Sequence, residues 1–566
     1  EGPGPKPVDP DEVVEGIPTY ATFNFVVQEG GAGTRAMSGD AGGESNAVNN
    51  LRMLIFKGSN DSIEANVYAT GSALKSQTVK VSSGEKKIFI VANAGGRSNL
   101  NAELSAFQPG SSTKGKVADL LGVIDLVASE PSYLTATPYI PSTVPSGVPG
   151  LATLVDQTAG HVMTNALDNR CIKILNANVD STDSNTGAPS AVTDNTNATN
   201  SITIGIQRTV AKVSTIYAAS ATSTVDGRGT LGGLKSVLQN VNRSLYLFQK
   251  FSGYPIPNPL PNPLTSYPQS PYYEYTAAPA DTAKWKNHYY SYPAGDLAAM
   301  ATTVGTSYYL TENTQGDPNH YRGSVSYVAI QGQYFPKANS HPAVLNYIAG
   351  PARGTTAPYN DSITFNAGTR VFTVKSTRYP AAAITTYATG AKLYQVRGML
   401  GATGIPDSMF FTDREAAYFV AWCINGGNPT AAPGAGGFDP SGTNYNKLPA
   451  GYTSPSATAE YTTITSLTYD KQTNNNPGAA LVYEYDQGYT YYRVPLYNPN
   501  GSPKTGVIRN HWYKVDVKAF KGIGETGLDD LNYPPDTPEE QGQTFVTATI
   551  TIDPWRVVDV PVDVVE

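Results

Sequence analysis

Alternation of apolar and polar residues with a period of two is the feature that most constrains this chain. It recurs from residues 21–27 near the start to 545–552 near the end, and such a period places alternate side chains on one face of a β-strand. Charged residues make up only 15%, against about 25% in a typical domain, while 54 glycines and 42 prolines supply turns. The pattern predicts a mainly β fold, most simply two β-sandwiches with short helical insertions.

Further strands and helices follow from the same reasoning. Residues 87–92 are apolar on both faces, which predicts a central strand, and Asp486, Gln487 and Gly488 predict a hairpin turn between 480–485 and 489–496. Helical spacing favours helices at 101–107 and 116–127, whereas 234–248 fits either a strand or a helix. The other expected strands are 51–56, 63–69, 202–216, 324–330, 370–374, 508–520 and 545–552. In 508–520 the residues expected to face inward are Tyr513, Val515, Val517 and Ala519. In 545–552 they are Val546, Ala548, Ile550 and Ile552.

The length of 566 residues is too large for one ordinary core and predicts two domains. We expect a leader with its strand at 1–35, an N-terminal sandwich at 36–228, a C-terminal sandwich at 229–554 and a terminal strand at 555–566. No apolar run approaches the roughly 20 residues of a membrane span. The Pro- and Gly-rich first residues predict a flexible leader that follows a processed export signal.

The last twelve residues form an amphipathic strand pattern. After Trp555, one face carries only valines and the other carries Asp559, Pro561 and Asp563; the valines are Val558, Val560, Val562 and Val564. Because Pro561 lacks an N–H group, this strand belongs at a sheet edge. It has two possible places: the edge of its own domain, or a neighbouring molecule's sheet, where main-chain hydrogen bonds and side-chain pockets would hold it.

The start of the chain offers a matching strand. Four alternate apolar residues, Ala21, Phe23, Phe25 and Val27, form one face, and a tether of small residues with a single basic residue, Arg35, follows. Exposed loops of small residues are preferred sites of proteolysis, so a trypsin-like protease is expected to cut between Arg35 and Ala36; the alternative is a solvated loop arginine. Loss of this strand would open a groove that four valines from a neighbour can fill, worth on the order of 6–10 kcal/mol before ordering costs. Because the donor and acceptor surfaces differ, such contacts propagate into a filament.

An ordered set of segments resembles the type V fimbrillins of the Bacteroidales, nearest to the shaft subunit of short fimbriae. The segments are Thr34-Arg35-Ala36, residues 206–213, 271–275 with 285–288, 489–495, 507–513, and 544–552 with Pro554-Trp555. The resemblance implies transthyretin-like sandwiches, export as a lipoprotein, and cleavage at Arg35–Ala36 by an arginine-specific protease. It also implies that residues 555–566 donate a strand to a neighbour that has lost residues 20–27, and that anchor and tip subunits share the fimbria on the outer membrane.

The sequence offers little support for a nucleotide-binding or metal-binding site. The motif Gly522-Ile-Gly-Glu-Thr-Gly527 matches a dinucleotide fingerprint, but the chain then runs into Pro534 and Pro535 instead of a helix. The five histidines are scattered, so we expect no metal and no cofactor. Cys171 and Cys423 are read as two buried thiols, with one disulfide as the alternative. Three Asp-Ser triplets, at 61–63, 361–363 and 407–409, resemble short O-glycosylation sites.

The sequence therefore predicts a structural subunit of a fimbrial shaft that polymerises with itself after proteolysis and supports adhesion or biofilm formation. A catalytic role is not expected. A net charge of −7 without a basic face excludes nucleic acid as a partner. The alternative is a monomeric surface module that binds glycans or proteins through Tyr-rich loops such as 267–275.

Overall fold

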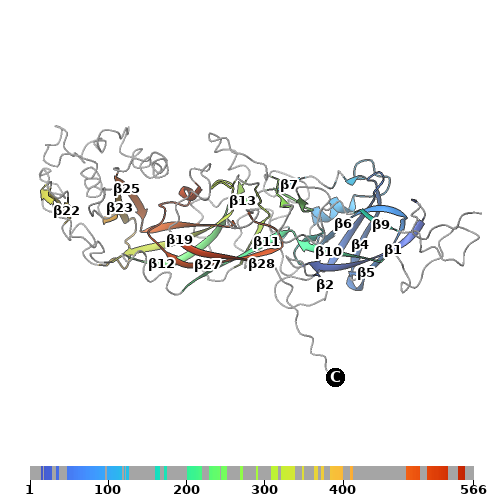
Figure 1. Cartoon of the computed structure of the whole chain (residues 1–566), viewed down its shortest axis with the longest axis horizontal. Coiled ribbons are helices and arrows are strands. Elements are labelled where there is room, and N and C mark those ends of the chain that lie inside the picture. Colours follow the sequence, from blue (N-terminus) through green and yellow to red (C-terminus); the bar gives the residue numbers. More distant parts are fainter. Residues whose placement is uncertain are drawn as a thin grey trace, which may run out of the picture.

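The computed structural model gives the protein an elongated shape, with sheets following one another along its length (Figure 1). The residues that it describes are 15–16, 18–28, 34–36, 48–125 with short gaps, 154, 160–165, 171–174, 201–218, 229–251 with a gap at 243, 268–271, 289–290, 307–337 with a gap at 316–319, 347–349, 363–366, 371–374, 383–398, 408–411, 480–497, 506–532 and 546–554.

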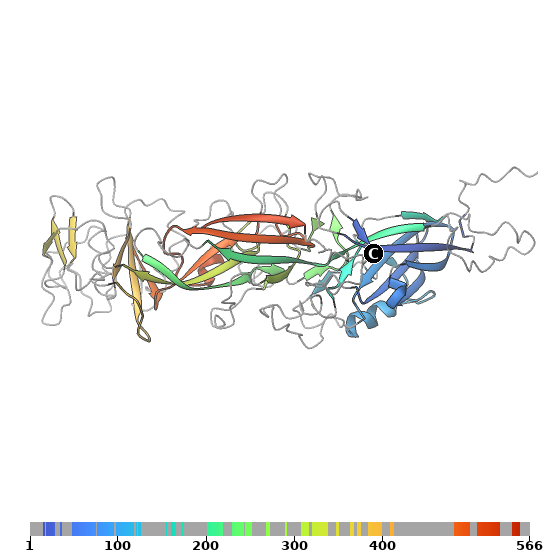
Figure 2. The same cartoon turned by 90° about the horizontal axis from the view of Figure 1, so that it is seen from below.

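The N-terminal part is one nine-stranded sheet that folds over on itself (Figure 2). Its order is β2 (Thr34–Ala36), β1 (Pro18–Gln28), β10 (Ser201–Arg208), β8 (Met163–Thr164), β6 (Gly84–Ala92), β3 (Asn50–Lys57) and β4 (Ile63–Thr70), with β5 (Ser76–Ser82) on β1 and β9 (Cys171–Ile174) on β6. Side chains from β1, β5 and β10 share one core cluster with side chains of β3 and β6. The two halves of the sheet therefore face each other as a sandwich.

The central strands β3 and β6 bury both of their faces. Met53 and Ile90 point into the cluster beneath β1, whereas Leu54 and Phe89 point into a second cluster on the opposite face. This is why residues 88–92 are apolar throughout, and it confirms the predicted central strand.

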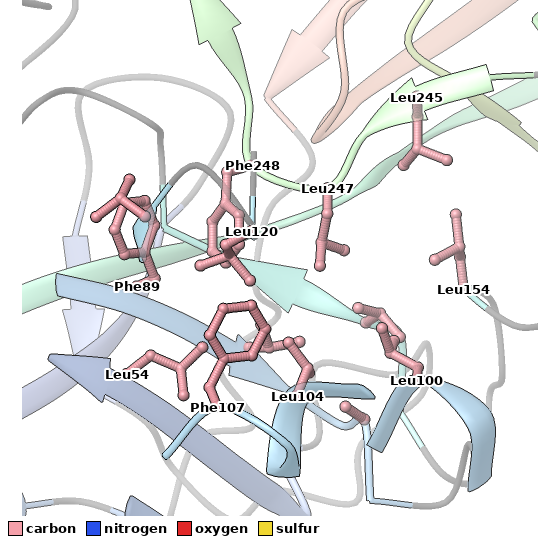
Figure 3. Packing of buried hydrophobic residues seen from close by; sticks show 14 of the residues in the cluster. Leu54, Phe89, Leu100, Leu104, Phe107, Leu120, Leu154, Leu245, Leu247 and Phe248 are labelled. Carbon is pink, nitrogen blue, oxygen red and sulfur yellow. The ribbon is translucent and has the colours of Figure 1, made fainter. Parts of the chain in front are cut away.

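The second cluster joins the two halves of the molecule (Figure 3). From the N-terminal side it takes Phe89 and residues of the helix α1 (Ser98–Ser105) and its flank. From the C-terminal side it takes Leu245, Leu247 and Phe248, which follow strand β12 (Gly229–Gln239). Strand β14 (Ser244–Tyr246) also pairs with β7 (Val123–Asp125), so a segment of the second half completes the core of the first.

The C-terminal part is built from two main sheets. One has the order β18 (Ser307–Thr311), β11 (Val210–Tyr217), β27 (His511–Phe520) and β28 (Val546–Pro554); the other has β12, β19 (Tyr327–Pro336) and β26 (Tyr489–Pro495). In the second sheet, Val237, Tyr327 and Tyr491, one from each strand, form a cluster with Leu528 and Leu531 of the loop that contains the 3-10 turn η7 (Asp529–Asn532).

Smaller sheets complete the described part. They pair β13 (Val241–Asn242) with β17 (Tyr289–Tyr290), β15 (Lys250–Phe251) with β16 (Pro268–Gln269), β20 (Tyr347–Ala349) with β21 (Ile363–Asn366) and β22 (Val371–Val374), and β24 (Ser408–Phe411) with β23 (Lys392–Gly398) and β25 (Ala480–Asp486). A short 3-10 turn, η1 (Gly71–Leu74), follows β4. The sheets that contain β22 and β23 lie at the end of the molecule away from β1 (Figure 1). The predicted fold class, mainly β with short helical insertions, is confirmed.

Strands β10 and β11 are consecutive, with only Thr209 between them. The first belongs to the N-terminal sheet and the second pairs in parallel with β27 of the C-terminal sheet. Thr209 itself is held by Val162, whose carbonyl accepts bonds from the Thr209 N–H at 3.1 Å and from its Oγ1 at 3.0 Å. The change from one sheet to the other thus occurs at Thr209, ahead of the expected domain boundary at 228.

A buried polar network lies at this joint. The Arg509 guanidinium faces the Glu312 carboxylate with an Nε–Oε1 distance of 3.6 Å, and both side chains are almost fully buried. Arg509 also donates to the carbonyls of Tyr246 at 2.6 Å and Leu247 at 2.9 Å. Burial raises the pKa of Glu312, and the charge of Arg509 opposes this shift. Gln249 donates to Glu312 at 2.6 Å, so the pair anchors the segment around residues 246–249, which packs into the core of the N-terminal half.

A second contact at the joint comes from the end of β10. The Arg208 Nη1 donates to Asn510 Oδ1 at 3.0 Å, and Gln207 Nε2 donates to Gln249 Oε1 at 2.5 Å. Both bonds connect the N-terminal sheet to residues far along the chain. Together with the shared apolar cluster, they favour a stiff connection over a flexible linker.

Two local expectations are wrong. Residues 116–127 do not form one continuous helix: Lys116 forms an isolated bridge with Ser62, a 3-10 turn joins Val117 to Leu120, and 123–125 form β7. The strand β25 does not form a hairpin with β26: β25 pairs with β23 and β26 with β19. Gln487 and Gly488 do adopt positive φ, at 47° and 71°, but the turn is a corner between two sheets.

The inward face of β27 also differs from the expected one at its end. Tyr513, Val515 and Val517 are buried as expected, but Ala519 is exposed and Phe520 is buried instead. The pairing of β27 with β28 shifts register between Val517 and Ala519, and such a bulge moves the following side chains to the other face. In β28, Val546 is buried, whereas Ala548 and Ile550 are half-buried.

Replacing Arg509 by Met should destabilise the protein strongly. The change leaves the Glu312 carboxylate buried without its cation, which typically costs about 3–5 kcal/mol. The Arg509→Met/Glu312→Gln double variant should recover part of that loss. Urea unfolding monitored by tryptophan fluorescence measures both.

The matched control is Lys392→Met, which removes an ion pair with Glu484 at 2.7 Å in which the lysine is 39% exposed. Exposed pairs contribute about 0–1 kcal/mol. If Arg509→Met lowered the free energy of unfolding by no more than Lys392→Met does, the stabilising role given to the buried pair would be contradicted.

Acidification should weaken the fold through His511. Burial lowers the pKa of His511 below its ordinary 6.5, and its Nδ1 lies 2.8 Å from the carbonyl oxygen of Arg509. Below pH 6.5 the histidine of the unfolded chain binds a proton, whereas His511 of the folded chain stays neutral until the pH reaches its lowered pKa. The free energy of unfolding therefore falls as the pH drops from 6.5 through the pKa of the folded state. His511→Asn should remove this part of the pH dependence in urea titrations at several pH values. Equal slopes in the wild type and the variant would contradict the assignment.

Candidate functional site: the leading strand and its slot

Strand β1 lies inside the N-terminal sheet although it comes from the beginning of the chain. Residues Thr22 to Val27 pair in parallel with β10, from Ser201 to Ile206. On its other side, β1 pairs antiparallel with β5, from Pro18↔Ser82 to Asn24↔Ser76. The segment is therefore hydrogen-bonded on both sides, and its removal would leave a slot between β5 and β10.

The inward face of β1 is fully part of the core. Ala21 and Phe23 are 0% exposed, and Phe25 and Val27 are 3% exposed. They pack with apolar side chains of β3, β5, β6 and β10, among them Val79, Val81, Met53, Ile55, Ile90, Ile204 and Ile206. Strand β1 thus has the apolar face that the alternation predicted, and it fills a lined slot.

Polar side chains on the outward face of β1 are also hydrogen-bonded. Thr22 Oγ1 lies 3.0 Å from Thr78 Oγ1 on β5, and Asn24 Nδ2 donates to Ser201 Oγ on β10 at 3.0 Å. These bonds cross to both neighbouring strands, so side chains as well as the backbone hold the strand in register.

Sequence reasoning missed a fifth inward residue, Thr19. It is 0% exposed, and its Oγ1 has no hydrogen-bond partner among the described residues. Its position two residues before Ala21 fits the period of two, but its polar side chain hid it from a search for apolar residues. The slot is therefore longer than the four apolar positions indicated.

The expected cleavage site lies beside the same strand. Thr34, Arg35 and Ala36 form β2, an edge strand whose three residues pair with the end of β1 at Gln28, Val27 and Val26. The sequence predicted a soft tether here; pairing with β1 draws these three residues into a short strand. Short edge strands open at low free-energy cost.

The rest of the expected site falls outside the described residues. This applies to Trp555 and to the valines Val558, Val560, Val562 and Val564, because the described chain ends at Pro554 at the end of β28. Their role stays a prediction. Cys423 also lies outside the described residues, whereas Cys171 begins β9, so the redox state of this pair stays open.

The glycine motif near residue 524 is a packing loop. A Cβ atom on Gly524 would fall on the carbonyl oxygen of Tyr491, and the Gly524 carbonyl already accepts a bond from Tyr485 Oη at 2.9 Å. A turn of four residues, η7, follows instead of a helix that could hold a pyrophosphate. The interpretation as a glycine-rich turn is the one that fits this geometry.

No group of three or more His, Cys, Asp or Glu side chains among the described residues is placed to hold a metal ion. Within the same residues, no helix has the length and apolar character needed to cross a membrane.

Two protein-family models match this chain, one in its N-terminal part and one in its C-terminal part. Residues 21–123 match the model of the major fimbrial subunit protein (FimA), a match that begins within β1. Residues 483–560 match the C-terminal model of fimbrillin, the type IV major fimbrial subunit protein. The chain matches the fimbrillins at both ends. The predicted resemblance is thereby confirmed, and it supports a structural subunit of surface fimbriae.

Solved structures show more distant likenesses. A candidate cell adhesion protein from Parabacteroides distasonis is 11% identical with a TM-score of 0.34, and the match covers 96% of this chain and 98% of that protein. A candidate cell adhesion protein from Bacteroides eggerthii is 11% identical with a TM-score of 0.35, and the match covers 96% of this chain and 97% of that protein. The tip fimbrial protein Mfa3 from Porphyromonas gingivalis, with a C-terminal truncation, is 12% identical with a TM-score of 0.27, covering 95% of this chain and 100% of its own. No curated protein matches the sequence.

Thr19→Val should leave the fold unchanged or stabilise it by up to about 2 kcal/mol, because it removes a buried hydroxyl that has no hydrogen-bond partner among the described residues. The control is Thr22→Val, which breaks the bond to Thr78 and should destabilise by roughly 1 kcal/mol. Urea unfolding of the two variants measures the difference. A larger loss in Thr19→Val than in Thr22→Val would contradict the placement of β1.

Proposed function

We propose that this chain is the shaft subunit of a surface fimbria and that it polymerises by strand exchange. A protease specific for arginine cuts between Arg35 and Ala36, β1 leaves, and residues 555–566 of a neighbouring molecule enter the slot. The exported chain reaches the outer membrane as a lipoprotein precursor, assembles with itself and with anchor and tip subunits, and the fimbria supports adhesion or biofilm formation.

The position of β1 is the observation that carries this proposal. Strand β1 is bonded to β5 and β10 on its two sides and fills the core between them with its inward face. Its departure uncovers the apolar lining of Ile204, Ile206, Val79 and Val81 together with two unpaired strand edges. Exposed apolar surface and open edges drive the uptake of another strand.

The place of Arg35 supports the proteolytic step. Its strand β2 pairs only with the last residues of β1 among the described pairings, so it is the weakest part of this sheet region. Opening three pairs exposes the bond between Arg35 and Ala36 without disturbing the core. After the cut, residues 1–35 are held by noncovalent contacts alone.

The sequence of the tail supports the exchange step. Val558 to Val564 have the same spacing as Ala21 to Val27, so one register places all four valines inward. In that register Pro561 takes the place of Asn24 in either strand direction, because both are the midpoints of their sets. On one side of β1, the pairing with β5 ends at Asn24, and the cut frees the β2 segment that pairs beyond it. Pro561 would therefore lie at the end of the β5 pairing, where a missing N–H group costs little.

Treatment with an arginine-specific protease should give a new N-terminus at Ala36 and then filaments. N-terminal sequencing and negative-stain electron microscopy before and after proteolysis test both steps. Arg35→Gln should remain monomeric under the same treatment, since its only expected cutting site in the tether is gone.

A second variant ends the chain at Trp555. It should be cut like the wild type and stay monomeric, because it lacks the strand that fills the slot. Normal filaments from this variant would overturn strand donation by the tail and favour a monomeric surface module or another mode of assembly.

A further inference from the structure

A buried arginine of the N-terminal sheet has neutral partners in place of an anion. Arg52 of β3 is 8% exposed, and within the described part of the chain no carboxylate pairs with it. Its Nη1 donates to Asn66 Oδ1 at 2.8 Å, and its Nη2 donates to Asn101 Oδ1 at 2.9 Å. Burial lowers the pKa of Arg52, as expected for a cation that has lost water without gaining an anion. Buried charges in proteins are normally paired, so this guanidinium departs from the rule.

The guanidinium of Arg52 has N–H groups left for a ligand. It carries five donors, and the bonds to Asn66 and Asn101 use two of them. Its Nε is buried and has no hydrogen-bond partner among the described residues. A carboxylate fits the fork of a guanidinium because its two oxygens can accept two parallel N–H groups. The chemistry therefore favours a carboxylate as the missing anion.

The two asparagines hold the guanidinium in a fixed place. Asn66 Nδ2 donates to the carbonyls of Leu104 at 2.9 Å and Phe107 at 2.7 Å, at the end of α1. Because these bonds occupy the nitrogen of the amide, its oxygen must face Arg52. Asn101 belongs to α1 itself. Arg52 is thus fixed between β4 and α1 before any ligand arrives, which lowers the ordering cost of binding.

An exposed aromatic ring lies next to this cation. Tyr68 of β4 pairs with Arg52 across the two strands and is 45% exposed, and the Arg52 Cζ lies 4.9 Å from its ring centroid. The Tyr68 hydroxyl lies against the backbone at Gly95, where a Cβ atom would collide with it. The Gly95 N–H donates to Asn50 Oδ1 at 2.7 Å, which fixes this loop. An exposed ring beside a few convergent polar groups is typical of a ligand site.

From these contacts we propose that Arg52 and Tyr68 form a binding site for an acidic sugar, a pyranose that carries a carboxylate. The carboxylate accepts hydrogen bonds from Arg52, and the sugar ring packs on the exposed part of Tyr68. The neighbours Leu51 and Met53 point into the core cluster beneath β1, so Arg52 points to the opposite face of the sheet. The inference goes beyond the proposed function, because a monomer carries this site as well as a filament does.

The test measures the binding of methyl β-D-glucuronide to the full-length, uncleaved protein by ligand-observed NMR at physiological ionic strength. Methyl β-D-glucoside is the neutral control, and acetate supplies the carboxylate alone. The glucuronide should bind at least about tenfold more tightly than either, because only it engages both the cation and the ring. Absence of glucuronide binding would overturn the inference, as would equal binding of the glucoside or acetate. Tighter binding of N-acetyl-aspartate would assign the site to a protein carboxylate and overturn it too.

Two variants separate the contributions of the cation and the ring. Arg52→Gln removes the charge and should lower the affinity for the glucuronide at least about tenfold. Tyr68→Ala should lower that affinity about fivefold and leave the affinity for acetate unchanged, because it removes only the packing of the sugar ring. Tyr68 is exposed, so this variant tests the site even if circular dichroism shows that Arg52→Gln does not fold. Unchanged glucuronide affinity in folded Tyr68→Ala would overturn the inference.

The matched control is Lys114→Gln, which removes a cation from the same flank of the sheet. Lys114 is 33% exposed and already pairs with Glu103 of α1 at 3.1 Å. Its loss should change the affinity for the glucuronide by less than about twofold, because salt screens exposed charges. A decrease as large as that in Arg52→Gln would show that overall charge attracts the ligand and would overturn the inference. All of these measurements use the uncleaved chain, so their failure leaves strand exchange standing.

Discussion

The packing of β1 between β5 and β10 is the contact on which the N-terminal sheet depends. Five successive inward positions, from Thr19 to Val27, fill the space between the two halves of the folded sheet, and the backbone is bonded on both sides. Strand β1 therefore contributes both main-chain bonds and core side chains to the N-terminal sheet.

The route from the slot to the other end of the chain is short and regular. Strand β10 forms one wall of the slot and continues through Thr209 into β11, which pairs with β27, which in turn pairs with β28. Strand β28 ends at Pro554, where the tail begins. In the proposed filament, tension between acceptor and donor would therefore pass along hydrogen-bonded neighbouring strands. The buried pair of Glu312 and Arg509 and the cluster around Phe89 and Phe248 stiffen this route at its one change of sheet.

The sequence predicts the parts of this architecture that depend on local alternation. The inward face of β1, the central position of β6 and the strand character of β27 all follow from a period of two, because burial selects apolar residues at alternate positions. Strand pairings between segments distant in sequence could not be predicted. Strands β25 and β26 are joined by a turn sequence typical of hairpins, yet β25 pairs with β23 and β26 pairs with β19. The exposure of Ala519 depends on a bulge that leaves no mark in the alternation. Thr19 was missed because its slot position is set by the sheet and not by its polarity.

The central claim is that a neighbour's tail replaces β1, and a cryo-electron microscopy map of filaments grown from the trimmed full-length chain tests it most directly. The account predicts a strand of residues 558–564 from the adjacent subunit between β5 and β10, with Val560 and Val562 in the pockets of Phe23 and Phe25. A map in which the released leader still occupies the slot, or in which the tail pairs with its own subunit, would contradict it.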